Sequence, residues 1–189
     1  MLFDGAEEQD FIGPYEVFSL AGVRRHRSFE TTYVTLDGPQ TITAVHGSKL
    51  VVDRGWSPES VGILLVSGGH AGVQEQIKLG ALPKALASAA RHGLTIASVC
   101  TGALLLSAAG LTVGRPCTTH HLYKDELRRE GGIVKDARVV DDGDLVTSGG
   151  VTSGLDLALW LVAREAGPDL AVDLEGILEY ERRGTILRT

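Results

Sequence analysis

Short apolar runs alternate along the chain with longer segments in which apolar residues recur at helical spacing. Residues 61–67 and 96–99 are rich in β-branched and aliphatic side chains, which predicts buried strands. A helical pattern follows each of these strands, over 74–91 and over 103–110. We expect Pro83 to kink or split the first of these helices. Strands that alternate with helices favour an α/β fold around a mainly parallel sheet.

The same pattern predicts elements towards both ends of the chain. Two apolar runs on either side of Asp141–Asp144 indicate a β-hairpin. Met1–Phe3 predicts a strand that begins late, which suggests that residues before it are missing. No repeat or linker divides the sequence, so we expect one domain over 1–189. The other expected elements are strands at 31–36, 41–45 and 115–120, and helices at 14–21, 123–130, 153–166 and 168–180.

The composition narrows the class of protein. Hydrophobic residues make up 43% of the 189 residues and charged residues 22%, which is an ordinary balance for a globular domain. The net charge of -6 argues against a nucleic-acid-binding surface, and we interpret the short basic patch Arg24–Arg27 as a solvated loop. No apolar run is long enough to span a bilayer, so no membrane segment is expected. Acidic residues near the N-terminus argue against a signal peptide.

The number and spacing of the cysteines and histidines indicate the cellular compartment of the protein and whether it binds a metal or another cofactor. Only two cysteines occur, Cys100 and Cys117, which favours a reducing cytoplasmic location. The alternative is that these two cysteines form a single disulfide bond. The histidines and cysteines show no metal-ligand spacing, and no Walker or dinucleotide glycine motif is present. We therefore expect neither a metal nor another cofactor.

The strand at 96–99 ends at Cys100, and Thr101 and Gly102 lead into the next helix. A thiol on such a turn points away from the core, and the start of a helix favours its thiolate form. This is the arrangement of an activated nucleophile. The alternative is that Cys100 is a small buried hydrophobe, since free cysteines are among the most buried residues. The pattern alone leaves both interpretations open.

Ligands of doubly wound sheets bind beyond the carboxyl ends of the strands. Polar residues or glycines follow four of the expected strands, so we expect these segments to share one rim. The amide of Gly69 or His70, together with the amide of Thr101, is expected to form an oxyanion or anion pocket. A plain tight turn at the glycines is the alternative. The four segments are Asp4–Asp10, Gly68–His70, Cys100–Gly102 and Thr118–His120.

Asp10 is a candidate acid. Phe11 and Ile12 follow it, which suggests that the chain turns inward and carries the carboxyl group towards the core. A carboxyl group in a partly apolar site has a raised pKa and can donate a proton. The alternative is that Asp10 caps a helix that begins at Pro14.

Two adjacent histidines are candidates to orient or deprotonate Cys100. His120 directly follows the short strand and is therefore preferred over His121. His70 is a weaker candidate for the same rim. For each of them the alternative is a structural histidine with its hydrogen bonds satisfied.

Several motifs together resemble the ThiJ/PfpI superfamily of class-I glutamine amidotransferase-like proteins. The resemblance covers nearly the whole chain. It implies a flavodoxin-like three-layer α/β sandwich with a mainly parallel central sheet and a small β-hairpin. Within the superfamily, the chain is most similar to isonitrile hydratases and to sensor domains of AraC-type transcription regulators. The motifs are Leu2–Gly5, Asp10–Phe18, Ser67–Gly69, Ser98–Ala103, Thr118–His120 and Thr147–Asp156.

Similarity to isonitrile hydratases implies a lyase that adds water to a small organic isonitrile and releases an N-substituted formamide. Cys100 would be the nucleophile and Asp10 the acid and base, with Thr101 beside the thiolate. Phe11 and Ile12 would line an apolar hollow for an uncharged substrate. The resemblance also implies a homodimer that needs no cofactor and whose ligand is a small molecule.

Two other functions stay open. Similarity to the regulator domains implies a ligand-sensing or redox-sensing domain without catalysis. A glyoxalase-like activity on small carbonyl compounds is the third possibility. Thr101 stands where protease-like members carry His, and Asp10 stands where glyoxalase-like members carry Glu. These two departures argue against peptidase and glyoxalase activity.

Overall fold

The computed structural model describes residues 1–24, 29–91 and 93–189. Three strands at one side of its central sheet are parallel to one another, and β7 forms the antiparallel hairpin with β8 that the sequence predicts. The last strand, β9, runs parallel to β7. In spatial order the sheet contains β3 (Ile63–Val66), β4 (Thr95–Ser98), β8 (Leu145–Ser148), β7 (Val139–Asp142) and β9 (Ile186–Arg188).

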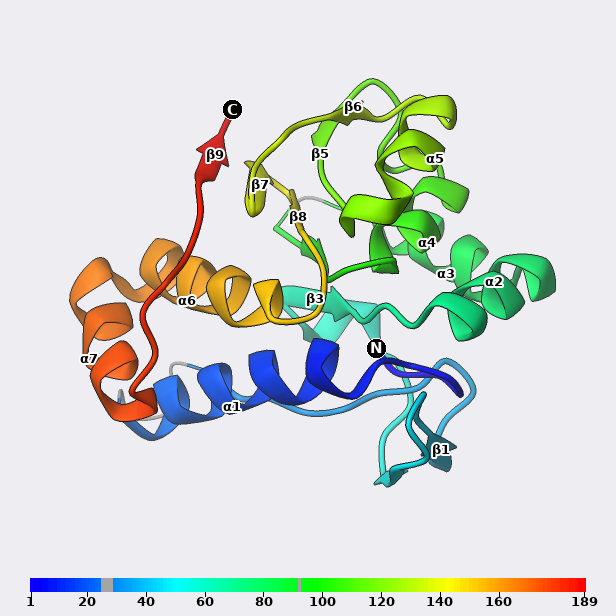
Figure 1. Cartoon of the computed structure of the whole chain (residues 1–189). Helices are drawn as coiled ribbons and strands as arrows, with labels where there is room; N and C mark the ends of the chain where they lie inside the picture. The colour runs from blue at the N-terminus through cyan, green and yellow to red at the C-terminus, as the bar shows by residue number, and fades with distance from the viewer. Residues whose placement is uncertain (25–28, 92) are drawn as a thin grey trace.

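Helices cover both faces of this sheet, as Figure 1 shows. One layer contains α1 (Glu8–Arg24), α6 (Ser153–Ala166) and α7 (Pro168–Leu178), which pack against one another. The other layer contains α2 (His70–Leu79), α3 (Ala81–Ala89), α4 (Gly102–Ala108) and α5 (Lys124–Arg129). This arrangement confirms the predicted three-layer α/β fold with a mainly parallel sheet.

Smaller elements flank the sandwich. A separate antiparallel ribbon joins β1 and β2, and a two-residue parallel pair joins β5 and β6. Their bounds are β1 Gln40–Thr43, β2 Lys49–Val52, β5 Pro116–Cys117 and β6 Ile133–Val134, and the two short 3₁₀ helices are η1 Pro58–Ser60 and η2 His121–Tyr123.

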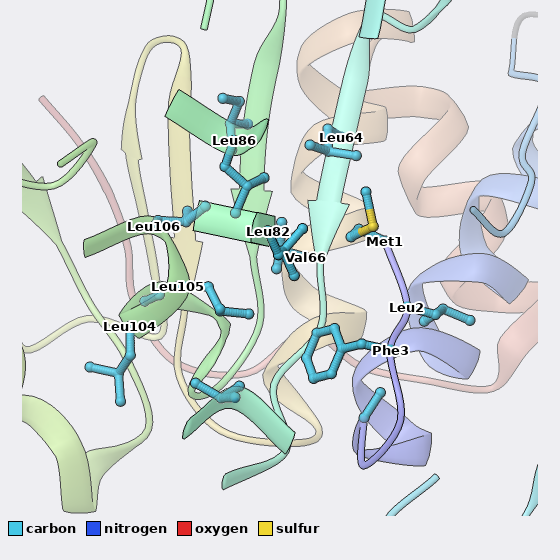
Figure 2. Close-up of a cluster of buried hydrophobic side chains, with 14 of the residues drawn as sticks. Met1, Leu2, Phe3, Leu64, Val66, Leu82, Leu86, Leu104, Leu105 and Leu106 are labelled. Carbon is cyan, nitrogen blue, oxygen red and sulfur yellow. The ribbon is translucent and has the colours of Figure 1, made fainter. Parts of the chain in front are cut away.

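The core lies on both faces of the sheet because successive side chains of a strand point to opposite faces. On one face Leu64, Val66 and Ile96 pack against leucines of α3 and α4, as Figure 2 shows for part of this cluster. On the other face Ala97 and Val146 pack against the layer of α1, α6 and α7. The continuous apolar runs in the sequence therefore correspond to strands that are buried on both sides.

The first helix differs most from its prediction. It begins at Glu8, not at Pro14, and it runs to Arg24. Proline lacks the amide proton that an internal helical position donates, so it is a poor guide to a helix that packing stabilises. Here Phe11, Val17 and other side chains of α1 are buried along one face, and that burial outweighs the lost hydrogen bond.

Other helices and strands also differ from their predicted boundaries. The helical segment after β3 does divide, but it divides at Gly80, whose φ of 74° ends α2, while Pro83 lies in the first turn of α3. The predicted strand at 31–36 is reduced to a bridge at Thr35, which pairs with Leu2 and with Gly55. The predicted strand Met1–Phe3 is likewise only this bridge.

The structure also bears on the expectations for the two cysteines, for a membrane-spanning helix and for the basic patch. Both cysteines are free, so the alternative of a bridge is wrong. Among the described residues, no helix combines the length and apolar character that crossing a bilayer requires. Most of the basic patch Arg24–Arg27 lies outside the described residues, and Arg24 itself forms an ion pair with Asp173 at 2.7 Å.

Candidate active site

Cys100 lies on a sharp turn between β4 and α4. Its φ of 57° falls in the left-handed region, which non-glycine residues rarely adopt. The Cys100 amide donates to the Gly149 carbonyl at 3.0 Å, and Gly102 donates back to Val99 at 2.9 Å. A Cβ on Gly102 would come within 2.6 Å of the Val66 carbonyl oxygen, so only glycine fits there. The Cys-Thr-Gly sequence therefore matches the geometry of a strained turn that presents its side chain at the end of the sheet.

Asp10 lies in the first turn of α1 and is fully buried. The amide of Gly68 donates to its Oδ2 at 2.9 Å. Its Oδ1 has no conventional hydrogen-bond partner among the described residues, and the Cys100 thiol interacts with the same carboxyl group. The structure thus brings together two residues that are 90 positions apart in the sequence, as the shared-rim hypothesis predicts.

Burial dominates the electrostatics of this pair. Burial raises the pKa of Asp10 to about 7, against the opposing effect of the Gly68 hydrogen bond. Burial and the neighbouring Asp10 also raise the pKa of the Cys100 thiol to about 11. Burial and the neighbouring Asp10 thus oppose the thiolate form of Cys100, whereas the start of the seven-residue α4 favours it. At neutral pH the site holds a protonated thiol beside a carboxyl group that is near its titration midpoint.

Hydrogen-bond donors surround the sulfur atom. The backbone amides of Thr101 and Val151, and the Thr101 side chain, interact with Cys100 and favour its charged form. The predicted donor Gly69 is directed elsewhere, since its amide donates to Thr101 Oγ1 at 3.0 Å. Sequence reasoning did not find Val151. Its φ of 46° gives no sequence signal, because a β-branched residue is not expected in that conformation.

The predicted histidines form a cluster beside the turn. His120 packs next to His121 and Tyr123, and His70 stacks on Tyr123 with ring centroids 5.0 Å apart. The Leu122 amide donates to His120 Nδ1 at 3.3 Å, and burial lowers the pKa of His120 below its ordinary value. None of the interactions found for Cys100 involves a histidine. The structural interpretation of His120 therefore fits better than direct deprotonation of the thiol.

A cavity of about 300 Å³ lies next to the turn that carries Cys100. Its lining includes Thr119, which donates to the Cys100 carbonyl at 2.8 Å, and Gly149 and Val151, which contact Cys100 as described above. The other lining side chains are mostly polar or charged, among them His120 and Arg138. Neither Cys100 nor Asp10 lines this polar cavity, so the expected apolar hollow between these two residues stays a prediction.

The two residues expected to make that hollow apolar lie elsewhere. Phe11 is buried, meets Tyr33 edge-on with ring centroids 5.8 Å apart, and lines a different cavity. Ile12 is 48% exposed. Adjacent helical positions point about 100° apart, so Asp10, Phe11 and Ile12 have different surroundings once the helix begins at Glu8.

One group of potential metal ligands occurs among the described residues. Glu7, Glu8 and His46 each place one ligand atom within 4.8 Å of the others. The Glu8 carboxylate already accepts hydrogen bonds from the amides of His46, at 3.0 Å, and Ser48. These contacts explain the cluster as an anchor for the β1–β2 loop.

Comparisons with known proteins are consistent with this geometry. Residues 1–164 match the model of the DJ-1/PfpI family. An isonitrile hydratase of Pseudomonas putida is 34% identical over 181 residues, which cover 95% of this chain and 76% of that protein. The transcriptional regulator GbdR of Pseudomonas aeruginosa is 30% identical over 152 residues, which cover 79% of this chain and 41% of the regulator.

A solved structure supports the same assignment. A ThiJ/PfpI family protein from Pseudomonas syringae superposes with a TM-score of 0.85 at 27% identity, covering 96% of this chain and 74% of that one. Together with the family match over residues 1–164 and the relative that is 34% identical, this superposition shows that this chain belongs to the DJ-1/PfpI family.

Proposed function

We propose that this protein hydrates a small organic isonitrile to an N-substituted formamide. One observation carries the proposal: the fully buried Asp10 carboxyl group lies at the Cys100 thiol with a pKa of about 7. A group with that pKa accepts and returns protons at neutral pH, which is what a general acid and base must do. The 34% identity with an isonitrile hydratase supports the choice of substrate class.

In the first step the Cys100 sulfur attacks the terminal carbon of the isonitrile. The Asp10 carboxylate accepts the thiol proton as the S–C bond forms and delivers it to the same carbon, which carries the developing negative charge. The product is a thioimidate bound to Cys100, and Asp10 returns to its carboxylate form. The amides of Thr101 and Val151 stabilise negative charge on sulfur during this transfer.

In the second step water adds to the thioimidate carbon. The Asp10 carboxylate takes one proton from the water and passes it to the nitrogen, which receives the electron pair of the C=N bond. The C–S bond of the tetrahedral intermediate then breaks, and the departing sulfur recovers the hydroxyl proton as the formamide leaves. The polar cavity next to the turn is suited to hold the water that this step consumes.

The second candidate is a ligand-sensing domain that binds a small molecule without turnover. The similarity to the regulator GbdR favours it. The raised pKa of Cys100 argues against the redox-sensing form of this hypothesis, because thiol oxidation proceeds through the thiolate. Saturable binding of an isonitrile with no formamide product would support the sensor.

The test is an assay of N-cyclohexylformamide formation from cyclohexyl isocyanide. We expect turnover by the unmodified chain, and a loss of kcat of at least about 100-fold in Cys100→Ala and in Asp10→Asn. Cys117→Ala is the matched control for the first variant, since Cys117 is the other buried free cysteine. Asp4→Asn, at an exposed carboxylate of the same segment, is the control for the second. Full turnover by either site variant would disprove the proposed roles.

A further inference from the structure

The polar cavity beside the Cys100 turn is lined by basic side chains. Among the described residues, no carboxylate lines it. The cavity therefore presents hydrogen-bond donors that the proposed chemistry at Cys100 does not use. Its basic lining residues are His120, His121, Lys124 and Arg138. Three segments of the chain supply the whole lining, at 119–124, 137–138 and 149–153.

The carboxylates that balance the two permanent positive charges lie outside this lining. Arg138 pairs with Asp156 through its Nε group at 2.5 Å, and its Nη2 group donates to Thr152 at 3.0 Å. Lys124 pairs with Asp136 at 2.8 Å, but the Asp136 side chain is 84% exposed. An exposed ion pair is weak, and an ammonium group has three N–H donors. Both cations therefore retain donors for an anion in the cavity.

His120 supplies a third donor. The Leu122 amide donates to its Nδ1 at 3.3 Å, and burial lowers its pKa below the ordinary value. At pH 7 the ring is therefore mainly neutral and carries its proton on Nε2. A Cβ on Gly150 would overlap His120 Cδ2 and would lie 3.0 Å from Nε2, so this edge of the ring faces the glycine turn that lines the cavity. His120 is thus oriented as a donor to the cavity.

Two residues link the cavity to the nucleophile. Val151 lines the cavity, and its backbone amide interacts with the Cys100 side chain. Thr119 also lines it and donates to the Cys100 carbonyl at 2.8 Å. A substrate joined to the sulfur atom can therefore extend a short chain past Val151 into the cavity. The volume of about 300 Å³ equals that of roughly ten water molecules at ~30 Å³ each, which is room for a small acid group and for water.

From the basic lining, the orientation of His120 and the link to Cys100, we propose that the substrate carries a carboxylate that binds in this cavity. Lys124, Arg138 and the Nε2 group of His120 are its donors. The inference rests on the proposed isonitrile hydration and narrows its substrate class to short isocyano acids. A single negative charge suits the site, because Asp136 and Asp156 already balance one charge each. A neutral isonitrile of similar size leaves these donors without the anion, and the site discriminates against it.

Turnover of two isonitriles of equal chain length tests the inference. They are 4-isocyanobutanoate and its methyl ester, which lacks the charge. For the unmodified chain, we expect kcat/KM for the carboxylate to exceed that for the ester at least about 10-fold. Lys124→Gln should lower kcat/KM for the carboxylate at least about 10-fold and that for the ester less than about 2-fold. Arg128→Gln is the matched control and should leave the ratio unchanged, because Arg128 lies on α5 with Lys124 but outside the lining.

Binding of the two formamide products separates this inference from the proposed function. Isothermal titration of Cys100→Ala measures the Kd of 4-formamidobutanoate and of its methyl ester without turnover. We expect the carboxylate to bind at least about 10-fold more tightly, and a second substitution, Lys124→Gln, to remove the difference.

The two assays fail in different ways. Equal kcat/KM values for the two isonitriles would overturn the carboxylate site and leave isonitrile hydration standing. Turnover of neither isonitrile would disprove isonitrile hydration, and the two Kd values would then decide the inference. Tighter binding of the carboxylate that depends on Lys124 would support the site, whereas equal Kd values would overturn it.

Discussion

Asp10 and Cys100 acquire their chemistry from burial more than from any contact between charged groups. Both side chains lie at the carboxyl edge of the sheet, and exclusion of water favours the neutral form of each. Burial raises both pKa values, to about 7 for Asp10 and to about 11 for Cys100, and Asp10 still titrates well below Cys100. In the proposed mechanism the carboxyl group is therefore the proton carrier, and the thiol gives its proton to that group as it attacks.

The raised pKa of Asp10 predicts a pH-dependent difference in stability between the unmodified chain and Asp10→Asn. The carboxyl group binds a proton in the folded state up to about pH 7 but in the unfolded state only up to its ordinary value of 3.8. Its contribution is fully present below pH 3.8 and is lost as the pH rises through 7. The free energy of unfolding of the unmodified chain, minus that of the variant, should fall by on the order of 4 kcal/mol between pH 4 and pH 8.

Urea denaturation of both proteins at several pH values measures this difference. The Met1 amine also titrates in this range, because burial lowers its pKa from 8.0 to about 5, but its contribution is common to both proteins and cancels. A difference that stays flat from pH 4 to pH 8 would contradict the assignment of a raised pKa to Asp10.

Sequence reasoning identified the residues at the site better than their surroundings. Cys100 and Thr101 were predictable because they follow an apolar run at a place where the chain changes direction, and Asp10 was predictable because apolar residues follow it. Val151 was not predictable, since its contact with Cys100 depends on a backbone conformation that its side chain disfavours. Phe11 was misplaced because the direction of a helical side chain depends on where the helix begins, and Pro14 suggested a later start.

The turns between strands and helices position the site, and their glycines are required by close contacts. Gly68 and Gly69 connect β3 to α2 and pass directly over Asp10 and Thr101. Gly69 has a φ of 123°, and a Cβ added there would overlap the Gly5 carbonyl oxygen. Gly47, in the β1–β2 loop, also has a positive φ, of 91°, but a Cβ there would have no neighbour within 4 Å.

This contrast predicts unequal effects of two alanine substitutions. Gly47→Ala should lower the free energy of unfolding by about 1 kcal/mol, because it introduces backbone strain only. Gly69→Ala should lower it by roughly 3 kcal/mol or more and should also reduce turnover, because the loop must move away from Gly5 and shift the Thr101 hydroxyl. Chemical denaturation of both variants checks the prediction, and equal losses of stability would show that the β3–α2 turn tolerates a side chain.

Periodicity located most helices and strands correctly but did not give their partners. The helix at 153–166 was predicted with the bounds that it has, because a long apolar pattern follows a pair of glycines. The strand predicted at 31–36 was wrong, since a strand needs a ladder of backbone partners and only Thr35 of residues 31–36 forms β-bridges. β9 is only three residues long and was missed, because its place next to β7 depends on contacts across the chain.

Two buried carboxylates, Asp141 and Asp156, hold distant parts of the molecule together. Asp141, on β7, accepts hydrogen bonds from Trp160 at 2.8 Å and from Arg164 at 3.2 Å, which tie the hairpin to α6. Asp156, on α6, accepts hydrogen bonds from Tyr180 and from the Arg183 amide and thereby fixes the segment that leads to β9. The spacing of these residues in the sequence gave no indication of either network.

The predicted homodimer is a property of the whole molecule that solution measurements can test. Light scattering after size-exclusion chromatography should give twice the chain mass of 20.0 kDa. The proportion of dimer should change little when the protein is diluted through the micromolar range, because interfaces of standard size are stable at such concentrations. A monomer at every concentration would rule out the dimer, although it would leave the roles proposed for Asp10 and Cys100 unchanged.

In the proposed reaction Cys100 forms a covalent thioimidate with the isonitrile carbon, using a proton carried by Asp10. Mass spectrometry of a rapidly acid-quenched single turnover detects this intermediate. We expect that the peptide containing Cys100 gains the full mass of cyclohexyl isocyanide, that the peptide containing Cys117 does not, and that the adduct forms at least about 100-fold more slowly in Asp10→Asn. Formamide release with no adduct on Cys100, or an adduct that forms equally fast without the Asp10 carboxyl group, would disprove this mechanism.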